Sequence, residues 1–181
     1  MSTQIDRSVI EYMVQQKWAL DLKTERKRYL FRLARESKND PDIASKIGGM
    51  LIYNQVIEQF LEDIVDMSIH YIKADLWPVQ VEMDVGSDSA TFGKVIDLFR
   101  QHALVCPDRD EILSALRKFN SKRNQVVHDL FDIRDLNKLG QELDEYGDLA
   151  GTIIRLLLKY EESIDSKFRE LEMRVDFSKL L

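Results

Sequence analysis

The sequence predicts an all-α protein, an antiparallel helical bundle of about five helices. Of its 181 residues, 44% are apolar and 32% charged, and only 7 are Gly and 3 are Pro. Such a composition favours a few long helices over many short strands. Apolar residues also recur at the helical period along stretches that short breaks separate. We interpret residues 1–181 as one domain, because a chain of this length can bury a single sizeable core.

Two long helices are predicted in the first half of the chain. The first runs from about Ile5 to Ser37, where residues that favour helix carry an apolar stripe. The second is expected to begin with Asp40 as N-cap and Pro41 at the first helical position. It should end near Leu76, because the residue before Pro78 is pushed out of the helical region.

The second half predicts three further helices after an extended connection. Val79–Ala90 alternates apolar and acidic residues, and we expect a crossover there because a lone strand has nothing to pair with. The third helix should span about Thr91–Ala103. The fourth should span Asp108–Phe131, with Asp108 and Glu111 as a pair resembling a capping box. The fifth should run from about Asp135 into the 170s.

Charge and cysteine content indicate a soluble, cytoplasmic protein. The 26 basic and 32 acidic residues give a net charge of −6, so any contact with RNA has to be local. Cys106 is the only cysteine, which excludes an intramolecular disulfide and fits a reducing compartment. Residues 1–10 lack an apolar signal core, and the uncharged run Ile47–Ile57 is too short to cross a bilayer. We therefore expect no membrane partner.

No residue pattern predicts a metal or a cofactor. His70 and His102 have no Cys, His or carboxylate set at metal-ligand spacing, and we interpret them as ordinary helical residues. Gly48-Gly49 lacks the spacing of a phosphate-binding loop. Cys106 has no base beside it in the sequence, and a lone cysteine is more often an inert packing residue than a reactive one.

The predicted fourth helix combines an apolar stripe with a polar one. Arg123 falls inside the apolar stripe, where a cation must be paired or must lie at the opening of a cleft. Asn120, Asn124 and His128 follow at intervals of four beside it, joined by Arg117. The apolar stripe itself consists of Ile112, Leu116, Phe119, Val126, Val127 and Leu130.

The predicted second helix contains a matching irregularity. Asn54 and Glu58 interrupt an otherwise apolar stripe. If the second and fourth helices are neighbours, Glu58 is the natural partner of Arg123, as a carboxylate–guanidinium pair. Such a pair could belong to a functional site, or it could only fix the register of two helices.

One segment of the fourth helix resembles a known family. Arg123-Asn124-Gln125-Val126-Val127-His128 resembles the Arg-x4-6-His signature of the HEPN superfamily, the higher eukaryotes and prokaryotes nucleotide-binding domains. Thr91–Phe99, a short gap and then residues 116–129 follow the order of several prokaryotic HEPN groups. The resemblance covers about residues 43–158, with residues 1–38 as an added N-terminal helix.

The resemblance implies a homodimer in which two copies of the motif face each other across a cleft. It also implies metal-independent RNA cleavage, by attack of the ribose 2′-OH on the adjacent phosphate. By position, Arg123 would stabilise charge on the phosphate, His128 would move the proton and Asn124 would orient the substrate. The supporting residues would be Glu58, Asn54, Arg117 and Asn120. A competing interpretation is that His128 is an ordinary surface-facing histidine.

Two functions therefore remain open. The first is a metal-independent endoribonuclease of the toxin or phage-defence type, with RNA as substrate and an antitoxin or another protein as partner. The alternative is a non-catalytic HEPN-like scaffold that binds a nucleotide or a protein. HEPN toxins silenced by a nucleotidyltransferase typically carry a Tyr two residues after the His. Leu130 occupies that position here, which argues against nucleotidylation at this site.

A basic segment in the first helix has two interpretations. Between Lys23 and Arg35 the chain carries six basic residues against one acidic residue, Glu25. This segment could contact RNA or another acidic partner. A solvated helical face is the commoner explanation of such a charge run.

Overall fold

The computed structural model describes residues 25–76, 91–130 and 135–174. All its regular structure in these ranges is helical, which confirms the all-α bundle. Residues 25–39 form the described part of the first helix. Four further helices follow: α2 (Ile43–Asp75), α3 (Phe92–His102), α4 (Arg109–Asp129) and α5 (Leu136–Arg174). None of the described helices is both long and apolar enough to cross a membrane.

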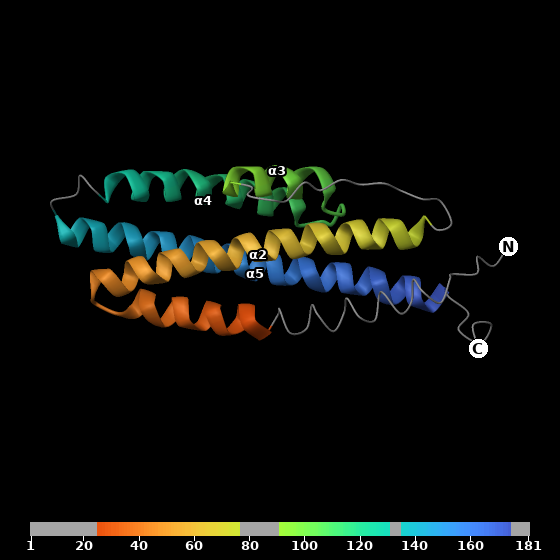
Figure 1. Cartoon of the computed structure of the whole chain (residues 1–181), viewed down its shortest axis with the longest axis horizontal. Helices are drawn as coiled ribbons and strands as arrows, with labels where there is room; N and C mark the ends of the chain where they lie inside the picture. Colours follow the sequence, from red (N-terminus) through yellow and green to blue (C-terminus); the bar gives the residue numbers. More distant parts are fainter. Residues whose placement is uncertain (1–24, 77–90, 131–134, 175–181) are drawn as a thin grey trace.

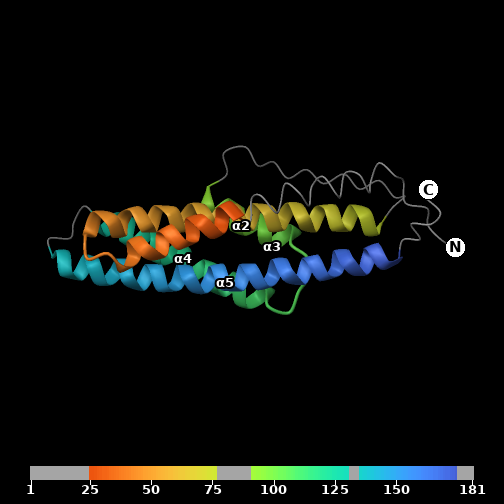
Figure 2. The same ribbon diagram turned by 90° about the horizontal axis from the view of Figure 1, so that it is seen from below.

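The helices form three layers (Figure 1). The long helices α2 and α5 make the middle layer and lie side by side along the length of the molecule (Figure 2). The segment 25–39 covers one side of this layer, and α3 and α4 cover the other. On that side α4 packs on α5 and α3 packs on α2. The ring of Phe99 in α3 also lies 5.4 Å from that of Tyr160 in α5. The middle layer therefore separates the segment 25–39 from α4.

Helix directions follow the length of the connections. The segment 25–39 runs antiparallel to α2, and α4 runs antiparallel to α3 and α5, as short connections require (Figure 1). By contrast, α2, α3 and α5 run in the same direction. Polar contacts confirm the parallel pair, because Lys46 near the start of α2 bonds Asp144 near the start of α5, at 2.6 Å. Further along, the rings of Tyr71 and Phe168 meet at 5.4 Å.

The predicted helix starts need two corrections. The N-cap of α2 is Asp42, not Asp40, because the Asp42 carboxylate accepts a bond from the Ser45 backbone N–H at 2.9 Å. The Asp40 carboxylate instead accepts from the backbone N–H of Asp42, which places Pro41 in the turn before the helix. At the start of α4, Asp108 makes no capping bond with its side chain.

The Asp108 carboxylate instead accepts a bond from Lys159 of α5 at 2.8 Å. The carboxylate is thus directed toward α5, and the Asp108 backbone (φ −87°, ψ 3°) lacks the extended conformation of an N-cap, so the capping pair with Glu111 does not form. At the far end, α4 stops at Asp129, and Phe131 lies outside the described residues. The predicted crossover Val79–Ala90 also lies outside them.

A buried ion cluster joins the segment 25–39 to both long helices. Lys27 was part of a charge run that we expected to be solvated, yet its side chain is only 2% exposed. Its ammonium lies 2.6 Å from a carboxylate oxygen of Glu161 in α5 and 3.1 Å from one of Asp63 in α2. The ammonium also lies 3.9 Å from the centre of the Phe60 ring. Gln59 donates to the other Asp63 oxygen at 3.1 Å.

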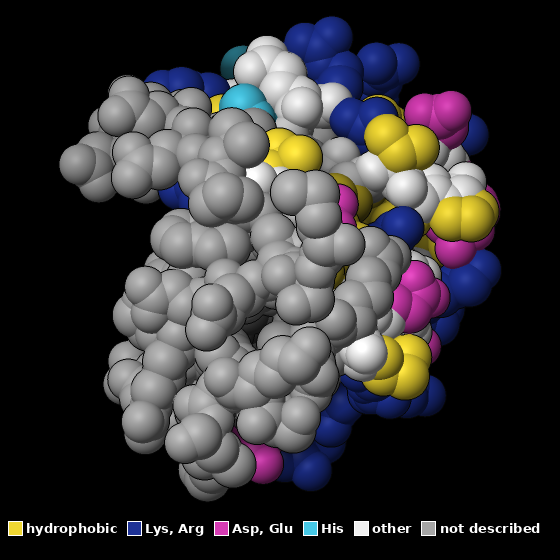
Figure 3. All heavy atoms as spheres, turned by 90° about the vertical axis from the view of Figure 1, so that its right-hand side faces the viewer, with side chains coloured by type: hydrophobic (Ala, Val, Ile, Leu, Met, Phe, Trp, Pro, Cys, Tyr) yellow, Lys and Arg dark blue, Asp and Glu magenta, His cyan; other side chains and the backbone are white. Residues whose placement is uncertain are grey.

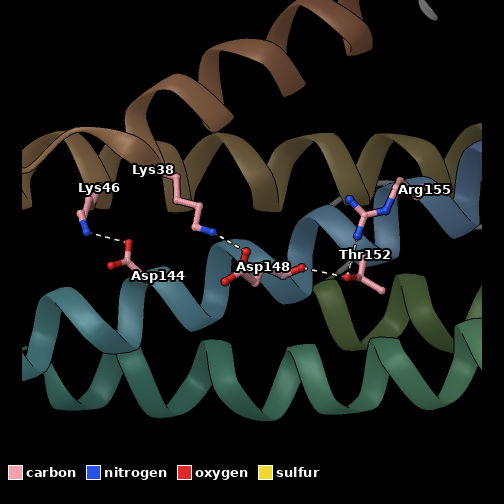
Figure 4. A network of polar contacts seen from close by, with 6 residues as sticks. All are labelled: Lys38, Lys46, Asp144, Asp148, Thr152 and Arg155. Carbon is pink, nitrogen blue, oxygen red and sulfur yellow. Dashed lines mark hydrogen bonds and ion pairs between the residues drawn. The ribbon is translucent and has the colours of Figure 1, made fainter.

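Close packing and outer ion pairs complete this junction. Gly49 in α2 lets the segment 25–39 approach, because a Cβ there would lie 3.0 Å from the Cβ of Ser37. Lys38 bonds Asp148 of α5, beside the pair of Lys46 and Asp144 (Figure 4).

Removing the buried ammonium should destabilise the fold. Lys27→Met leaves two buried carboxylates without their shared cation, which should lower the free energy of unfolding by about 3–5 kcal/mol. Urea unfolding followed by circular dichroism measures this loss. The matched control is Arg28→Met, an exposed residue on the same helix, which should change the value by less than about 0.5 kcal/mol. Equal effects of the two substitutions would contradict this account of the cluster.

Glu161 should make stability depend on pH. Burial raises the pKa of this carboxyl above 4.5, and the Lys27 ammonium only partly opposes the shift. The folded state therefore favours the protonated acid, so the side chain stabilises most below pH 4.5 and least once the pH exceeds its raised pKa. Glu161→Gln cannot titrate. Its melting temperature relative to wild type should rise as pH increases through this window, whereas exposed Glu162→Gln should give a constant difference.

Candidate functional site

Helix α4 presents Asn124 and His128 of the Arg–His motif on its outer side. Its inner face is anchored by Ile112, Leu116, Phe119 and Val126, none of which has any exposed surface. Asn124 and His128 are exposed one turn apart, which corresponds to a rise of about 6 Å along the helix. The rigid, buried side of α4 therefore holds the motif's polar residues at a defined spacing in solvent.

The polar stripe extends back along the same face. Arg117, Ser121, Asn124 and His128 are all exposed, and their spacing places them within about 60° around the helix. Asn120 lies half-buried at the edge of this stripe. Between residues 117 and 128 the chain has four basic and no acidic residues. This half of α4 is locally positive on an acidic protein, a charge pattern suited to phosphate.

Arg123 lies on the inner side of α4, about 140° around the helix axis from His128, and packs over an aromatic ring. Its side chain is half-buried, and its guanidinium carbon lies 5.4 Å from the centre of the Phe92 ring at the start of α3. Phe92 is 4% exposed, so the ring supplies a fixed face for the cation. A guanidinium held by one ring face keeps N–H donors available for an anion.

A run of aromatic contacts connects this ring to α5 and α2. The Phe92 and Phe119 rings lie 5.6 Å apart, and those of Phe119 and Tyr146 lie 4.7 Å apart. The Tyr146 hydroxyl then donates to the Asn54 side-chain oxygen of α2 at 2.5 Å. Burial raises the pKa of Tyr146, although the charge of Arg123 opposes the shift. The hydroxyl therefore stays protonated and acts as a donor.

The expected pair of Arg123 and Glu58 does not form. Among the described residues, no ion pair joins them, and the Asn54 oxygen is occupied by Tyr146. The physical reason is the arrangement of the helices, since α2 and α4 are not neighbours and each packs on α3 and α5. Glu58 is half-buried on α2, apart from the α4 motif. The structure thus groups Arg123, Asn124, His128, Arg117 and Asn120 on α4 and separates Glu58 from them.

Sequence reasoning missed Phe92 and Tyr146. Both are aromatic residues in apolar helical stripes, which is also the pattern of ordinary core residues. Only their positions across three helices show that they support Arg123. Lys122 was missed as well, and it bonds Glu145 of α5 at 3.0 Å, fixing the register of α4 beside the motif. The sequence shows opposite charges at positions 122 and 145. No sequence pattern indicates, however, that these two residues of different helices form a pair.

The described part of the chain contains no group of three or more His, Cys, Asp or Glu side chains arranged to hold a metal ion. His70 is half-buried on α2, where burial lowers its pKa. Cys106 is buried within the core.

Comparison with family models, with curated proteins and with solved structures gave no match.

Arg123 should contribute little to stability. Arg123→Gln removes a half-exposed cation–π contact and should lower the free energy of unfolding by about 0.5–1 kcal/mol. Glu58→Ala should also cost less than about 1 kcal/mol, since it leaves no charge unpaired on α4. Chemical denaturation of both variants beside wild type measures this. A loss of about 3–5 kcal/mol in both would instead indicate a buried ion pair in solution.

Proposed function

We propose that the chain is a HEPN-like, metal-independent endoribonuclease of the toxin or phage-defence type, active as a cytoplasmic homodimer. The observation that carries the proposal is the exposed polar stripe on α4, together with the half-buried Arg123 of the same helix. These side chains supply a cation, amide groups and an imidazole on one rigid helix. That set is sufficient to bind a phosphate and move a proton beside it.

The proposed reaction is a transesterification. His128 accepts the proton of the ribose 2′-OH, and the 2′-oxygen attacks the adjacent phosphorus. The bond from phosphorus to the 5′-oxygen breaks, and the imidazolium returns a proton to that leaving oxygen. The products are a 2′,3′-cyclic phosphate and a 5′-hydroxyl. No metal enters the reaction as proposed.

The other α4 side chains take roles that their positions allow. Arg123 neutralises charge that develops on the phosphate oxygens, held over the Phe92 ring rather than by a carboxylate. Arg117 lies on the stripe of His128, about 16 Å along the helix, and would contact a neighbouring phosphate of the substrate. Asn124 and Asn120 would orient the substrate by hydrogen bonds.

The dimer is supported by apolar surface beside the motif. Val127, which directly precedes His128, is 40% exposed, and Leu130 at the end of α4 is only half-buried. Leu136 at the start of α5 is 64% exposed. A second copy packed against this end of α4 would cover these side chains and bring two motifs together.

The same apolar surface favours a second candidate function. A non-catalytic HEPN-like scaffold would also use exposed Val127 beside polar residues, to bind a protein such as an antitoxin. The scaffold does not require turnover by His128. Catalysis therefore separates the two candidates.

Purified protein should cleave mixed single-stranded RNA in the presence of EDTA and leave 2′,3′-cyclic phosphate ends. His128→Ala and Arg123→Ala should each reduce the rate by at least about 100-fold, because a general base and a charge-stabilising cation are worth that much. Gel analysis with end-group chemistry measures both results. Gln125→Ala, an exposed neighbour on α4, is the matched control and should retain activity.

The same samples test the assembly. Sedimentation at tens of micromolar, an order-of-magnitude choice for a standard-sized interface, should show a dimer for wild type and for His128→Ala. Equal cleavage by wild type and His128→Ala, or cleavage that EDTA abolishes, would refute the mechanism. A dimer without cleavage would support the scaffold.

A further inference from the structure

The exposed side of the segment 25–39 carries four arginines. Arg26, Arg28, Arg32 and Arg35 are all exposed, and no ion pair among the described residues includes any of them. The two lysines of this segment differ, since Lys27 and Lys38 both bind carboxylates of other helices. The lysines therefore hold the helix in place, while the arginines make no such bond within the described part of the chain.

Three of these arginines lie on one side of the helix. Arg28, Arg32 and Arg35 fall within about 60° around the helix axis and span about 10 Å along it. Like charges at this spacing repel one another, and exposed Glu25 and Glu36, each about one turn from one of these arginines, offset only part of the repulsion. A bound polyanion would remove it.

An exposed aromatic ring lies among the arginines. Tyr29 is 56% exposed, and the guanidinium carbon of Arg32 lies 5.7 Å from the centre of its ring. A ring beside guanidinium groups is the combination that binds nucleobases by stacking and phosphates by bidentate hydrogen bonds.

We propose that this face, defined by Arg28, Tyr29, Arg32 and Arg35, binds single-stranded RNA. The arginines contact the sugar–phosphate backbone, and a base stacks on Tyr29. Charge complementarity requires a polyanion, and the exposed ring favours a nucleic acid over an acidic peptide. The choice of RNA rests on the proposed function, which needs RNA as its substrate.

This face is separate from the α4 motif. The segment 25–39 and α4 lie on opposite sides of the layer that α2 and α5 form (Figure 1). Viewed from the end of the molecule, Lys and Arg side chains gather at the lower edge, on the side of the segment 25–39, and again at the upper edge, on the side of α3 and α4 (Figure 3). The arginines would therefore add affinity for RNA without contacting the atoms that react.

Binding is best measured in the full chain with His128→Ala, so that the probe stays intact. The probe is a fluorescent oligouridine of about 20 nucleotides, long enough to exceed the site of one binding module, followed by anisotropy. Arg28→Gln combined with Arg32→Gln should weaken binding at least about tenfold and lower the salt dependence by about one to two counterions. The matched control removes two exposed arginines of α5, Arg155→Gln with Arg169→Gln, and should weaken binding at most about twofold.

The ring has its own test. Tyr29→Ala should weaken binding about fivefold or more, whereas Tyr29→Phe should preserve it, because stacking needs the ring and not the hydroxyl. Equal effects of the two arginine pairs, or full affinity in Tyr29→Ala, would overturn the proposal. So would competition by polyglutamate as effective as that by unlabelled oligouridine, which would indicate an acidic protein partner. Circular dichroism verifies the fold of each variant.

Cleavage assays separate this inference from the proposed function. With His128 restored, the Arg28 and Arg32 double variant should raise KM at least about fivefold and leave kcat within about twofold, because it removes binding without touching the reacting atoms. Oligouridine binding that depends on this face, without any cleavage by wild type, would support the RNA surface and refute the nuclease. Cleavage by wild type, with oligouridine binding that does not change when this face is substituted, would support the nuclease and refute the RNA surface.

Discussion

The packing of the bundle depends on the buried cluster of Lys27, Asp63 and Glu161. These residues come from three helices, and Lys27 and Glu161 are 134 positions apart in the sequence. Burial raises the pKa of Glu161, and the single ammonium of Lys27, shared with Asp63, only partly opposes this shift. Such a cluster tolerates little displacement, because each group would be left charged and unpaired. It therefore fixes how the segment 25–39 lies on α2 and α5.

The opposite side of the middle layer is held differently. There α3 and α4 pack through aromatic rings, and their polar contacts with α5, such as those of Asp108 and Lys122, lie toward the surface. Burial of apolar area fixes α4 without occupying its outer polar side chains. Arg123 is the exception, and an aromatic face stabilises it without using up its hydrogen-bond donors. This arrangement leaves the motif available for a ligand.

The two positive surfaces are thus consequences of the layers. In each outer helix, some charged residues form ion pairs with the middle layer and others are exposed to solvent. On α4 the remaining side chains include the imidazole and amides of the motif, whereas on the segment 25–39 they are arginines and a tyrosine. The proposed chemistry at the first surface and the proposed affinity at the second are therefore separable by substitution.

The sequence by itself determined the helices and the polar stripe of α4. Helical periodicity, Pro41 and the scarcity of glycine are local properties, so the number and approximate extent of the helices followed from them. The exposure of Arg117, Asn124 and His128 also followed, since spacing along one helix determines which residues share a face. Only the tertiary structure decided the neighbours of each helix. In the folded protein Arg123 packs on Phe92 and not on Glu58. Lys27 is buried beside carboxylates that lie far away in the sequence. The physical reason is that contacts between helices depend on packing order and direction, and the parallel course of α2 and α5 is not encoded in any single helix.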